Sequence, residues 1–185
     1  KHLTSIMEAM TEGYEIRIEY QKYTRSQADT YTLKPYAVKE FAKRWYIVAY
    51  CVERDALRVY GLDRVRDMEL TGKPFSMPAD FNVDELFATS FGIYLPGEKA
   101  RTITFKVSER EARFLRDLPL HKSQEEIESK DGYVTFSIFV CPDRNMIMEF
   151  CRYGSRLEVI SPADIRKEIA AELRSAADIY RQDAP

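Results

Sequence analysis

The sequence has few of the residues from which most catalytic and metal sites are built. It holds only two histidines, His2 and His121, and three cysteines without a CxxC pair. An odd cysteine count without metal-ligand spacing argues against a disulfide framework and a zinc site, so we expect reduced thiols at Cys51, Cys141 and Cys151. The sequence also lacks GxSxG, P-loop, GxGxxG and HExxH motifs. We therefore expect no enzymatic activity, no metal and no cofactor.

The chain also lacks an excess of positive charge and a long apolar run. Lys and Arg number 28 against 30 Asp and Glu, a net charge of −2, so the chain as a whole lacks the basic surface typical of duplex-binding domains. Any nucleic-acid contact must be local. No apolar run approaches the ~20 residues of a membrane span, and the first residues lack the apolar core of a signal peptide. We expect a cytoplasmic protein.

Residues 1–71 predict a small all-β domain that begins with a short helix. Apolar residues at helical spacing run from Leu3 to Met10, and Gly13 suits the position just past a helix C-terminus. From residue 14 to residue 70 the period changes to two, in five short runs of β-branched and aromatic residues. So many short antiparallel strands favour a small, strongly bent barrel, because closing the sheet removes its exposed edges.

The pattern changes at residues 72–100 and restarts after them. Residues 72–100 contain three prolines and three glycines and predict a connector, with one helical turn near residues 82–92. Residues 101–185 then alternate as strand, helix, two strands, helix, strand and a long final helix. This βαββαβ order is that of a ferredoxin-like α+β domain with an added C-terminal helix. Ser108 as a helix N-cap and Gly154 as a helix end agree with it.

Two neighbouring strands of the first domain each carry arginine and tyrosine at alternate positions. Alternate residues of a strand face opposite sides, so in "RWYIVAYC" and "LRVYGLDRV" we predict one apolar face and one Arg/Tyr face. The apolar side of the first strand carries Trp45, which we expect in the core as a structural residue. The candidate ligand-binding residues of the other face, with one from an earlier strand, are Arg44, Tyr46, Tyr50, Arg58, Tyr60, Arg64 and Tyr20.

Guanidinium groups beside tyrosine rings suit a ligand with an anionic group next to a flat ring. Arginine forms bidentate hydrogen bonds to phosphate or carboxylate, and stacking of a base on an aromatic ring contributes about 1–3 kcal/mol. Residues 34–66 hold eight Lys and Arg against four Asp and Glu, a local net charge of +4. The alternative is that the tyrosines cover the barrel ends and each arginine pairs with an acid such as Asp63, worth about 0–1 kcal/mol. The pattern leaves both open.

The same residues resemble a known family. The run "RWYIVAYC" followed by "LRVYGLDRV", preceded by "IEY" and "KPY", resembles the WYL domain, named for a Trp-Tyr-Leu triplet that is Trp45-Tyr46-Ile47 here. Residues 148–180 resemble the WYL C-terminal extension, with a helix, a glycine-containing turn, a strand and a final helix. Two departures are isoleucine for the triplet's leucine and Lys43 where the family usually has glycine.

The resemblance implies the sensory part of a bacterial transcriptional regulator. It implies an Sm-like barrel that usually follows a winged helix-turn-helix, and a ligand that is a nucleotide or a single-stranded nucleic acid. Trp45 carries over as a structural residue. The family's basic and aromatic positions carry over onto Arg44, Tyr46, Arg58, Tyr60 and Arg64, with looser matches at Tyr20 and Tyr50.

No segment has helix-turn-helix spacing, so we expect the C-terminal part of a longer regulator that binds operator DNA through a domain absent from this chain. Such regulators are commonly homodimers. Apolar residues of the final helix could make the dimer contact or pack on their own sheet, namely Ala170, Leu173, Ala176, Ala177 and Tyr180. A constitutive nucleic-acid-binding module and a purely structural oligomerisation module remain as alternatives.

Overall fold

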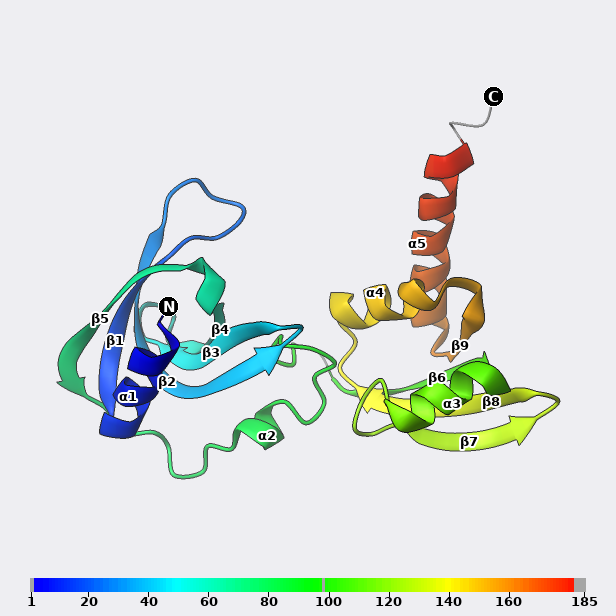
Figure 1. Cartoon of the computed structure of the whole chain (residues 1–185), viewed down its shortest axis with the longest axis horizontal. Helices are drawn as coiled ribbons and strands as arrows, with labels where there is room; N and C mark the ends of the chain where they lie inside the picture. The colour runs from blue at the N-terminus through cyan, green and yellow to red at the C-terminus, as the bar shows by residue number, and fades with distance from the viewer. Residues whose placement is uncertain (1, 98, 182–185) are drawn as a thin grey trace. The chain divides into compact units, whose positions relative to one another are not determined.

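The computed structural model describes residues 2–97 and 99–181 and divides into two compact units between Phe87 and Ala88 (Figure 1). Each unit contains one antiparallel sheet, and the chain ends in a long helix. The predicted mixed fold of two antiparallel sheets with a C-terminal helix is therefore confirmed. Within the part of the chain that is described, no helix is long and apolar enough to cross a membrane.

The first unit has one five-stranded sheet with a helix at each end of its sequence. Its strands pair in the order β4-β3-β2-β1-β5. The N-terminal helix ends as predicted, because Gly13 adopts the left-handed conformation, with φ of +73°, that glycine tolerates best. The elements are α1 (Leu3–Glu12), β1 (Tyr14–Tyr20), β2 (Asp29–Phe41), β3 (Arg44–Cys51), β4 (Ala56–Gly61), β5 (Val65–Pro74) and α2 (Val83–Leu86), with the 3-10 turns η1 (Val52–Arg54) and η2 (Leu62–Arg64).

The core of the first unit lies between α1 and the concave face of this sheet. Ile6 of α1 packs with Ile16 and Ile18 of β1 and with Ile47 of β3, and none of the four has exposed surface. Burying each such side chain contributes about 1.5–3 kcal/mol relative to leaving it in water. The alternation of apolar residues seen in the sequence therefore corresponds to one buried face.

Residues 72–100, predicted as a connector, are divided between the two units. Strand β5 continues to Pro74, and the rings of Phe75 and Phe81 lie 6.0 and 5.0 Å from that of Tyr36 on β2. In the second unit, Phe91 packs against the helix α4 at 6.3 Å from the ring of Phe150. The segment thus covers apolar surface in each unit.

The second unit has a four-stranded antiparallel sheet in the order β7-β8-β6-β9. The order of elements along the chain is the predicted one. Ser108 caps α3 by accepting a hydrogen bond from the amide of Glu111 at 3.3 Å, and Gly154 follows α4. The elements are β6 (Arg101–Ser108), α3 (Glu109–Asp117), β7 (Glu125–Lys130), β8 (Tyr133–Val140), α4 (Arg144–Tyr153), the 3-10 turn η3 (Gly154–Arg156), β9 (Leu157–Ser161) and α5 (Ala163–Arg181).

The helices of the second unit pack on one face of its sheet. Phe105 of β6, Phe136 of β8 and Phe150 of α4 form the centre of this core, with ring centroids 5.4 to 5.8 Å apart in the two contacting pairs. Helix α5 joins the core through Ile165 and Ile169 near its start. Beyond Leu173 its described residues are exposed, so only its first half is held by the sheet.

Candidate ligand site in the first unit

Three tyrosine rings meet at the centre of the candidate site. Tyr20 of β1, Tyr31 of β2 and Tyr60 of β4 have centroids 5.0 to 6.5 Å apart and belong to the buried core. We call them the tyrosine cluster. The hydroxyl of Tyr20 accepts a hydrogen bond from the amide of Gly61 at 3.2 Å, which fixes the end of β4 against β1. The cluster is therefore a rigid platform and not an open stacking surface.

Four cations surround the tyrosine cluster, and we call them the cationic rim: Lys22, Arg44, Arg54 and Arg64. Arg64 lies between two rings, with its guanidinium carbon 5.1 Å from the centroid of Tyr20 and 5.2 Å from that of Tyr23. Such cation–π contacts favour a fixed guanidinium plane. The Nε of Arg64 is buried and has no hydrogen-bond partner among residues 2–97 and 99–181.

Gly61 makes room for that guanidinium. A Cβ at this position would lie 2.6 Å from Oδ1 of Asp63, 3.0 Å from Nη2 of Arg64 and 3.2 Å from its Nε. The backbone of Gly61 has φ of −72°, which any residue can adopt. The glycine is therefore needed for the close approach of Arg64 and Asp63 and not for its own conformation.

Arg44 is held by the loop that follows β1. Its Nη1 donates to the hydroxyl of Tyr23 and to Oδ2 of Asp63, both at 3.1 Å, and the Tyr23 hydroxyl donates to the same carboxylate at 2.9 Å. The hydrogen bond from Arg44 to Tyr23 is the main cause that raises the pKa of the Arg44 guanidinium. Arg44 therefore has an acidic partner in Asp63, as in the alternative interpretation in which each arginine pairs with an acid.

Tyr31 organises the opposite side of the rim. Its hydroxyl accepts hydrogen bonds from Nζ of Lys22 at 3.0 Å and from Nη2 of Arg54 at 3.3 Å, and it donates to Oδ2 of Asp29 at 3.0 Å. Lys22 also pairs with Asp29 at 3.1 Å. Hydrogen bonds from Lys22 and Tyr31 lower the pKa of the Asp29 carboxyl, so this carboxylate stays ionised and offsets Lys22.

Three further arginines of the first unit lack an acidic partner of this kind in the described chain. Within the described chain, no carboxylate lies within 4.0 Å of a guanidinium nitrogen of Arg54, Arg58 or Arg64. Burial raises the pKa values of Tyr20 and Tyr60, so both phenols stay neutral beside these cations. An anion that reaches this end of the unit meets guanidinium groups that are oriented but not neutralised, which is the arrangement that binds phosphate or carboxylate most strongly.

The strand register separates the residues that were predicted to share one Arg/Tyr face. Directly paired residues of an antiparallel ladder lie on the same side of the sheet, and β3 pairs with β4 as Ala49 with Arg58 and Tyr50 with Leu57. Arg58 and Tyr60 therefore lie on the side of the buried β3 residues, whereas Tyr46 and Tyr50 lie on the opposite side. The prediction of a common face is wrong, because parity within one strand does not fix the register between two.

Tyr50 lies in a different part of the first unit. Its ring is 5.3 Å from Nζ of Lys34, and it lines a hollow with Tyr36 and Phe81. The residues that follow β5 pack over this outer side of the sheet, which explains why Val48 is buried there as well. Tyr46 and Tyr50 thus remain predicted ligand residues that the structure does not bring to the cationic rim.

Three further positions differ from the predictions. Trp45, expected in the core, is 41% exposed, because β4 ends opposite Tyr46 and the tip of the β2–β3 hairpin extends beyond it. Tyr60, expected on an open face, is only 5% exposed, and Tyr20 is 3% exposed. Tyr20 contributes to the site by positioning Arg64, and Tyr60 packs against the rings of Tyr20 and Tyr31.

Several residues of the site were not predicted. Tyr23 is 73% exposed and lies in the loop between β1 and β2, where the alternation of strand residues gives no signal. Arg54 lies in the turn η1, and Lys22 lies in the same loop as Tyr23, so neither follows the period of a strand. Arg64 is among the predicted residues, although it lies in the turn η2. For Arg54 and Arg64 the sequence signal is the excess of positive charge over residues 34–66.

The geometry agrees with the families that the sequence matches. The profile of the WYL domain matches residues 1–70, and that of the WCX domain matches residues 99–177. The chain is a WYL domain followed by a WCX domain. The tyrosine cluster and the cationic rim lie in the WYL domain, and the four-stranded unit with α5 contains the WCX domain.

The WYL–WCX chain is similar to proteins from two species of Mycobacterium and to proteins of known structure. Protein PafB of Mycobacterium bovis and protein PafB of Mycobacterium tuberculosis are each 26% identical over 178 residues, which cover 93% of this chain and 52% of theirs. The chain thus spans about half the length of these curated relatives. The proteasome accessory factor B/C (PafBC) of Arthrobacter aurescens matches 98% of this chain and 27% of its own, with 20% identity and a TM-score of 0.41.

A CRISPR Cas-related protein shares the fold over 98% of this chain and 51% of its own, with 14% identity and a TM-score of 0.55. Among the residues that are described, no group of three or more His, Cys, Asp or Glu is placed to hold a metal ion. The site is thus one of arginines and aromatic rings.

Proposed function

We propose that this chain is the ligand-sensing part of a transcriptional regulator and that its WYL domain binds a nucleotide or a short single-stranded nucleic acid. The observation that carries the proposal is the guanidinium of Arg64, which is fixed between Tyr20 and Tyr23 without a carboxylate partner in the described chain. A planar, pre-oriented guanidinium loses little entropy when it binds a phosphate bidentately.

The exposed groups around Arg64 fit the remainder of such a ligand. Tyr23 offers an exposed ring that lies against Arg64, and Arg44 donates to its hydroxyl. Bases of any sequence can stack on such a ring, while Arg54, held by Tyr31 of the tyrosine cluster, supplies further positive charge. We therefore favour recognition of phosphate and ring together over recognition of a base sequence.

The regulatory part of the proposal concerns a longer protein. We propose that a helix-turn-helix domain outside this chain binds operator DNA and that the ligand alters its affinity. A ligand can shift such an equilibrium only if it binds one arrangement of the protein better than the other. A difference of about 1–3 kcal/mol between the two arrangements is sufficient.

We also propose specific architectures for the two units. The strand order β4-β3-β2-β1-β5 with an N-terminal helix supports an Sm-like barrel, although no ladder joins β4 to β5 within residues 2–97. The order β7-β8-β6-β9 with helices α3 and α4 between strands supports a ferredoxin-like unit.

Homodimerisation through α5 is a further part of the proposal. Ile179 and Tyr180 are exposed near the end of this helix, beyond the part that packs on the sheet. If a second copy covers them, sedimentation velocity should show a dimer for the unchanged chain and a monomer for the double variant Ile179→Asp, Tyr180→Asp. Lys167→Asp, on the first half of α5, serves as the control and should remain dimeric. A monomer in the unchanged chain at tens of micromolar would remove this part of the proposal.

The binding proposal is tested directly by titration. A fluorescein-labelled oligodeoxythymidine of about five nucleotides should bind with saturable anisotropy, and the affinity should fall with salt at a log–log slope of about −2, the value for two to three phosphate contacts on a single strand. A DNA hairpin whose stem forms a stable duplex should bind more weakly, since its paired bases cannot stack on exposed rings. Equal affinity for both, with a steeper salt dependence, would instead indicate a constitutive nucleic-acid-binding module.

One observation favours a purely structural module. Arg44 pairs with Asp63 and Lys22 with Asp29, so part of the cationic rim is already neutralised. If pairing with the protein's own carboxylates is the role of all cations of the cationic rim, neither the oligonucleotide nor a mononucleotide will bind at any accessible concentration. The unpaired state of Arg54, Arg58 and Arg64 in the described chain makes binding the favoured outcome.

A further inference from the structure

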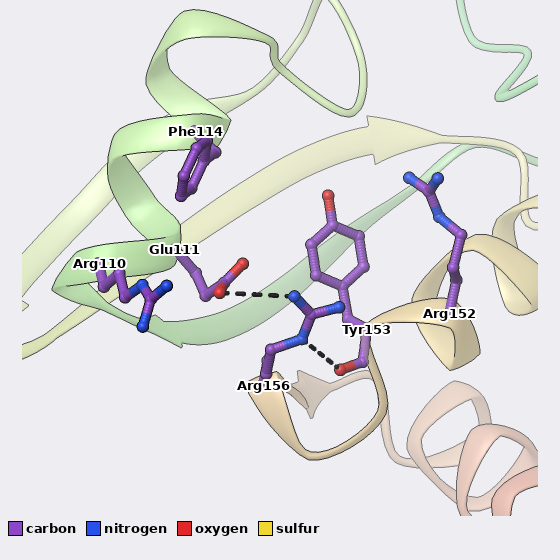
Figure 2. A pocket seen from close by; sticks show the side chains of 6 residues that line it. All are labelled: Arg110, Glu111, Phe114, Arg152, Tyr153 and Arg156. Atoms are coloured by element: carbon purple, nitrogen blue, oxygen red, sulfur yellow. Dashed lines mark hydrogen bonds and ion pairs between the residues drawn. The ribbon is translucent and has the colours of Figure 1, made fainter.

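A second arginine-rich hollow lies in the WCX unit, away from the residues of the WYL domain. A cleft of about 390 Å³ lies between α3 on one side and the end of α4 with η3 on the other, and Figure 2 shows the side chains that line it. This volume falls within the roughly 300–1,000 Å³ of most small-molecule sites. The cleft is lined by Arg110, Glu111, Phe114, Arg152, Tyr153 and Arg156.

The cleft is electrostatically positive because three arginines face a single glutamate. Nη1 of Arg156 lies 3.6 Å from Oε1 of Glu111, and its Nε donates to the carbonyl oxygen of Tyr153 at 3.3 Å. Arg152 pairs with Glu149, which does not line the cleft. Arg110 has no carboxylate within 4.0 Å among residues 2–97 and 99–181. The two ion pairs offset the charges of Arg152 and Arg156, so Arg110 is the arginine of the cleft without an acidic partner in the described chain.

Aromatic rings lie on both sides of the cleft. The guanidinium carbons of Arg152 and Arg156 are each 5.8 Å from the ring centroid of Tyr153 (Figure 2). Phe114 projects from α3 and is 65% exposed, which is unusual for a residue of this size. The folding of the unit does not require its exposure, whereas a flat ligand that stacks on it would use it.

The protonation of Tyr153 suits a hydrogen bond to an anion. Partial burial is the main cause that raises the pKa of its hydroxyl, and the charge of Glu149 acts in the same direction. The phenol therefore stays protonated at neutral pH and can donate. A ligand in the cleft would then meet donors from the arginines that line it and from the hydroxyl of Tyr153.

We infer that this cleft is a binding site for a small molecule with a phosphate ester attached to a flat ring, such as a nucleoside monophosphate. Arg110 contacts the phosphate, and Phe114, one helical turn further along α3, contacts the ring together with Tyr153. Arg152 adds positive charge from α4 on the other side of the cleft (Figure 2), and Arg156 is a positioning residue that holds Tyr153 and Glu111. This inference goes beyond the proposed function, because every residue of the cleft lies in the WCX unit and none belongs to the cationic rim.

Isothermal titration calorimetry of the full 185-residue chain with adenosine monophosphate tests the inference. We expect saturable binding, and we expect Arg110→Ala to weaken it about 10-fold, the effect of one charge-assisted hydrogen bond. Arg152→Ala should weaken it less, because Arg152 is paired with Glu149. Tyr153→Phe keeps the ring and should weaken binding less than Tyr153→Leu. Arg113→Ala is the matched control, because Arg113 is exposed on the same helix α3 and does not line the cleft.

Titrations with the separate parts of the nucleotide, and with a variant of the WYL domain, distinguish the possible outcomes. Adenosine and inorganic phosphate should each bind at least about 10-fold more weakly than the complete nucleotide if ring and phosphate are both recognised. Equal binding of phosphate and nucleotide would overturn the ring contact, and equal losses in Arg110→Ala and Arg113→Ala would overturn the site. Arg64→Ala should leave this binding unchanged. If it abolishes binding instead, the nucleotide occupies the WYL site and the inference fails while the proposed function stands.

Discussion

Replacement of Arg64 by alanine should weaken the binding of a short single-stranded oligonucleotide by about 10- to 30-fold, because it removes a charge-assisted, pre-oriented phosphate contact worth roughly 1.5–3 kcal/mol. The salt dependence should become shallower by about one phosphate contact, or ~0.7 in the log–log slope. Arg64→Lys keeps the charge but loses the planar contact with Tyr20 and Tyr23, so an intermediate loss is expected. Fluorescence anisotropy at several salt concentrations measures both quantities.

Arg66→Ala is the control for this prediction. Arg66 carries the same charge two residues further along, is exposed, and makes none of the aromatic contacts of Arg64. Its removal should change the affinity by less than about 3-fold. If the two variants lose affinity equally, the oligonucleotide responds only to net charge and the positioned guanidinium is not its site.

Replacement of Gly61 tests the placement of the Arg64 side chain without removing any charge. In Gly61→Ala, the added methyl group displaces the side chains of Asp63 and Arg64, so binding should weaken in the same direction as in Arg64→Ala. Gly97→Ala is the matched control, since nothing lies within 4 Å of a Cβ at that position. Wild-type affinity in Gly61→Ala would show that the exact placement of Arg64 does not matter.

Most of the fold could be predicted because its signals are local. The helix before Gly13, the strands of both units and the N-cap at Ser108 follow from periodicity and capping over a few residues each. The site could be predicted only in part, because it depends on register. The η1 turn and Asp55, with φ of +48°, set which residues of β3 and β4 are opposite one another, and no alternation within one strand contains that information.

The misplaced aromatic residues show how register changes the chemistry of the site. Trp45 has the parity of the core, yet it lies where β2 is its only strand neighbour in the described chain, and its ring is exposed. Tyr20 and Tyr60, predicted to contact a ligand, are buried; Tyr20 holds Arg64 and the end of β4 in place, and Tyr60 packs on the ring of Tyr20. The arginines of the predicted stripe are spread over β3, β4 and η2, because Arg58 pairs with Ala49 whereas Arg44 lies at the start of β3. The exposed ring in contact with Arg64 is that of Tyr23.

Replacement of Tyr60 by alanine should destabilise the first unit by about 3–5 kcal/mol, the cost of a large cavity in a packed core. Tyr60 is 5% exposed and contacts the rings of both Tyr20 and Tyr31. Trp45 is the only tryptophan of the chain and lies in β3. Urea denaturation followed by its fluorescence therefore reports the unfolding of the first unit alone.

In contrast to Tyr60→Ala, Tyr23→Ala should affect oligonucleotide binding more than the free energy of unfolding. Tyr23 is exposed, so its loss should cost about 1 kcal/mol or less in the free energy of unfolding. It should nevertheless weaken oligonucleotide binding several-fold, because it removes one of the two rings that hold Arg64 and an exposed surface for a base. A Tyr60→Ala variant of wild-type stability would contradict the buried cluster, since a ring with so many neighbours cannot be removed from a close-packed core without cost.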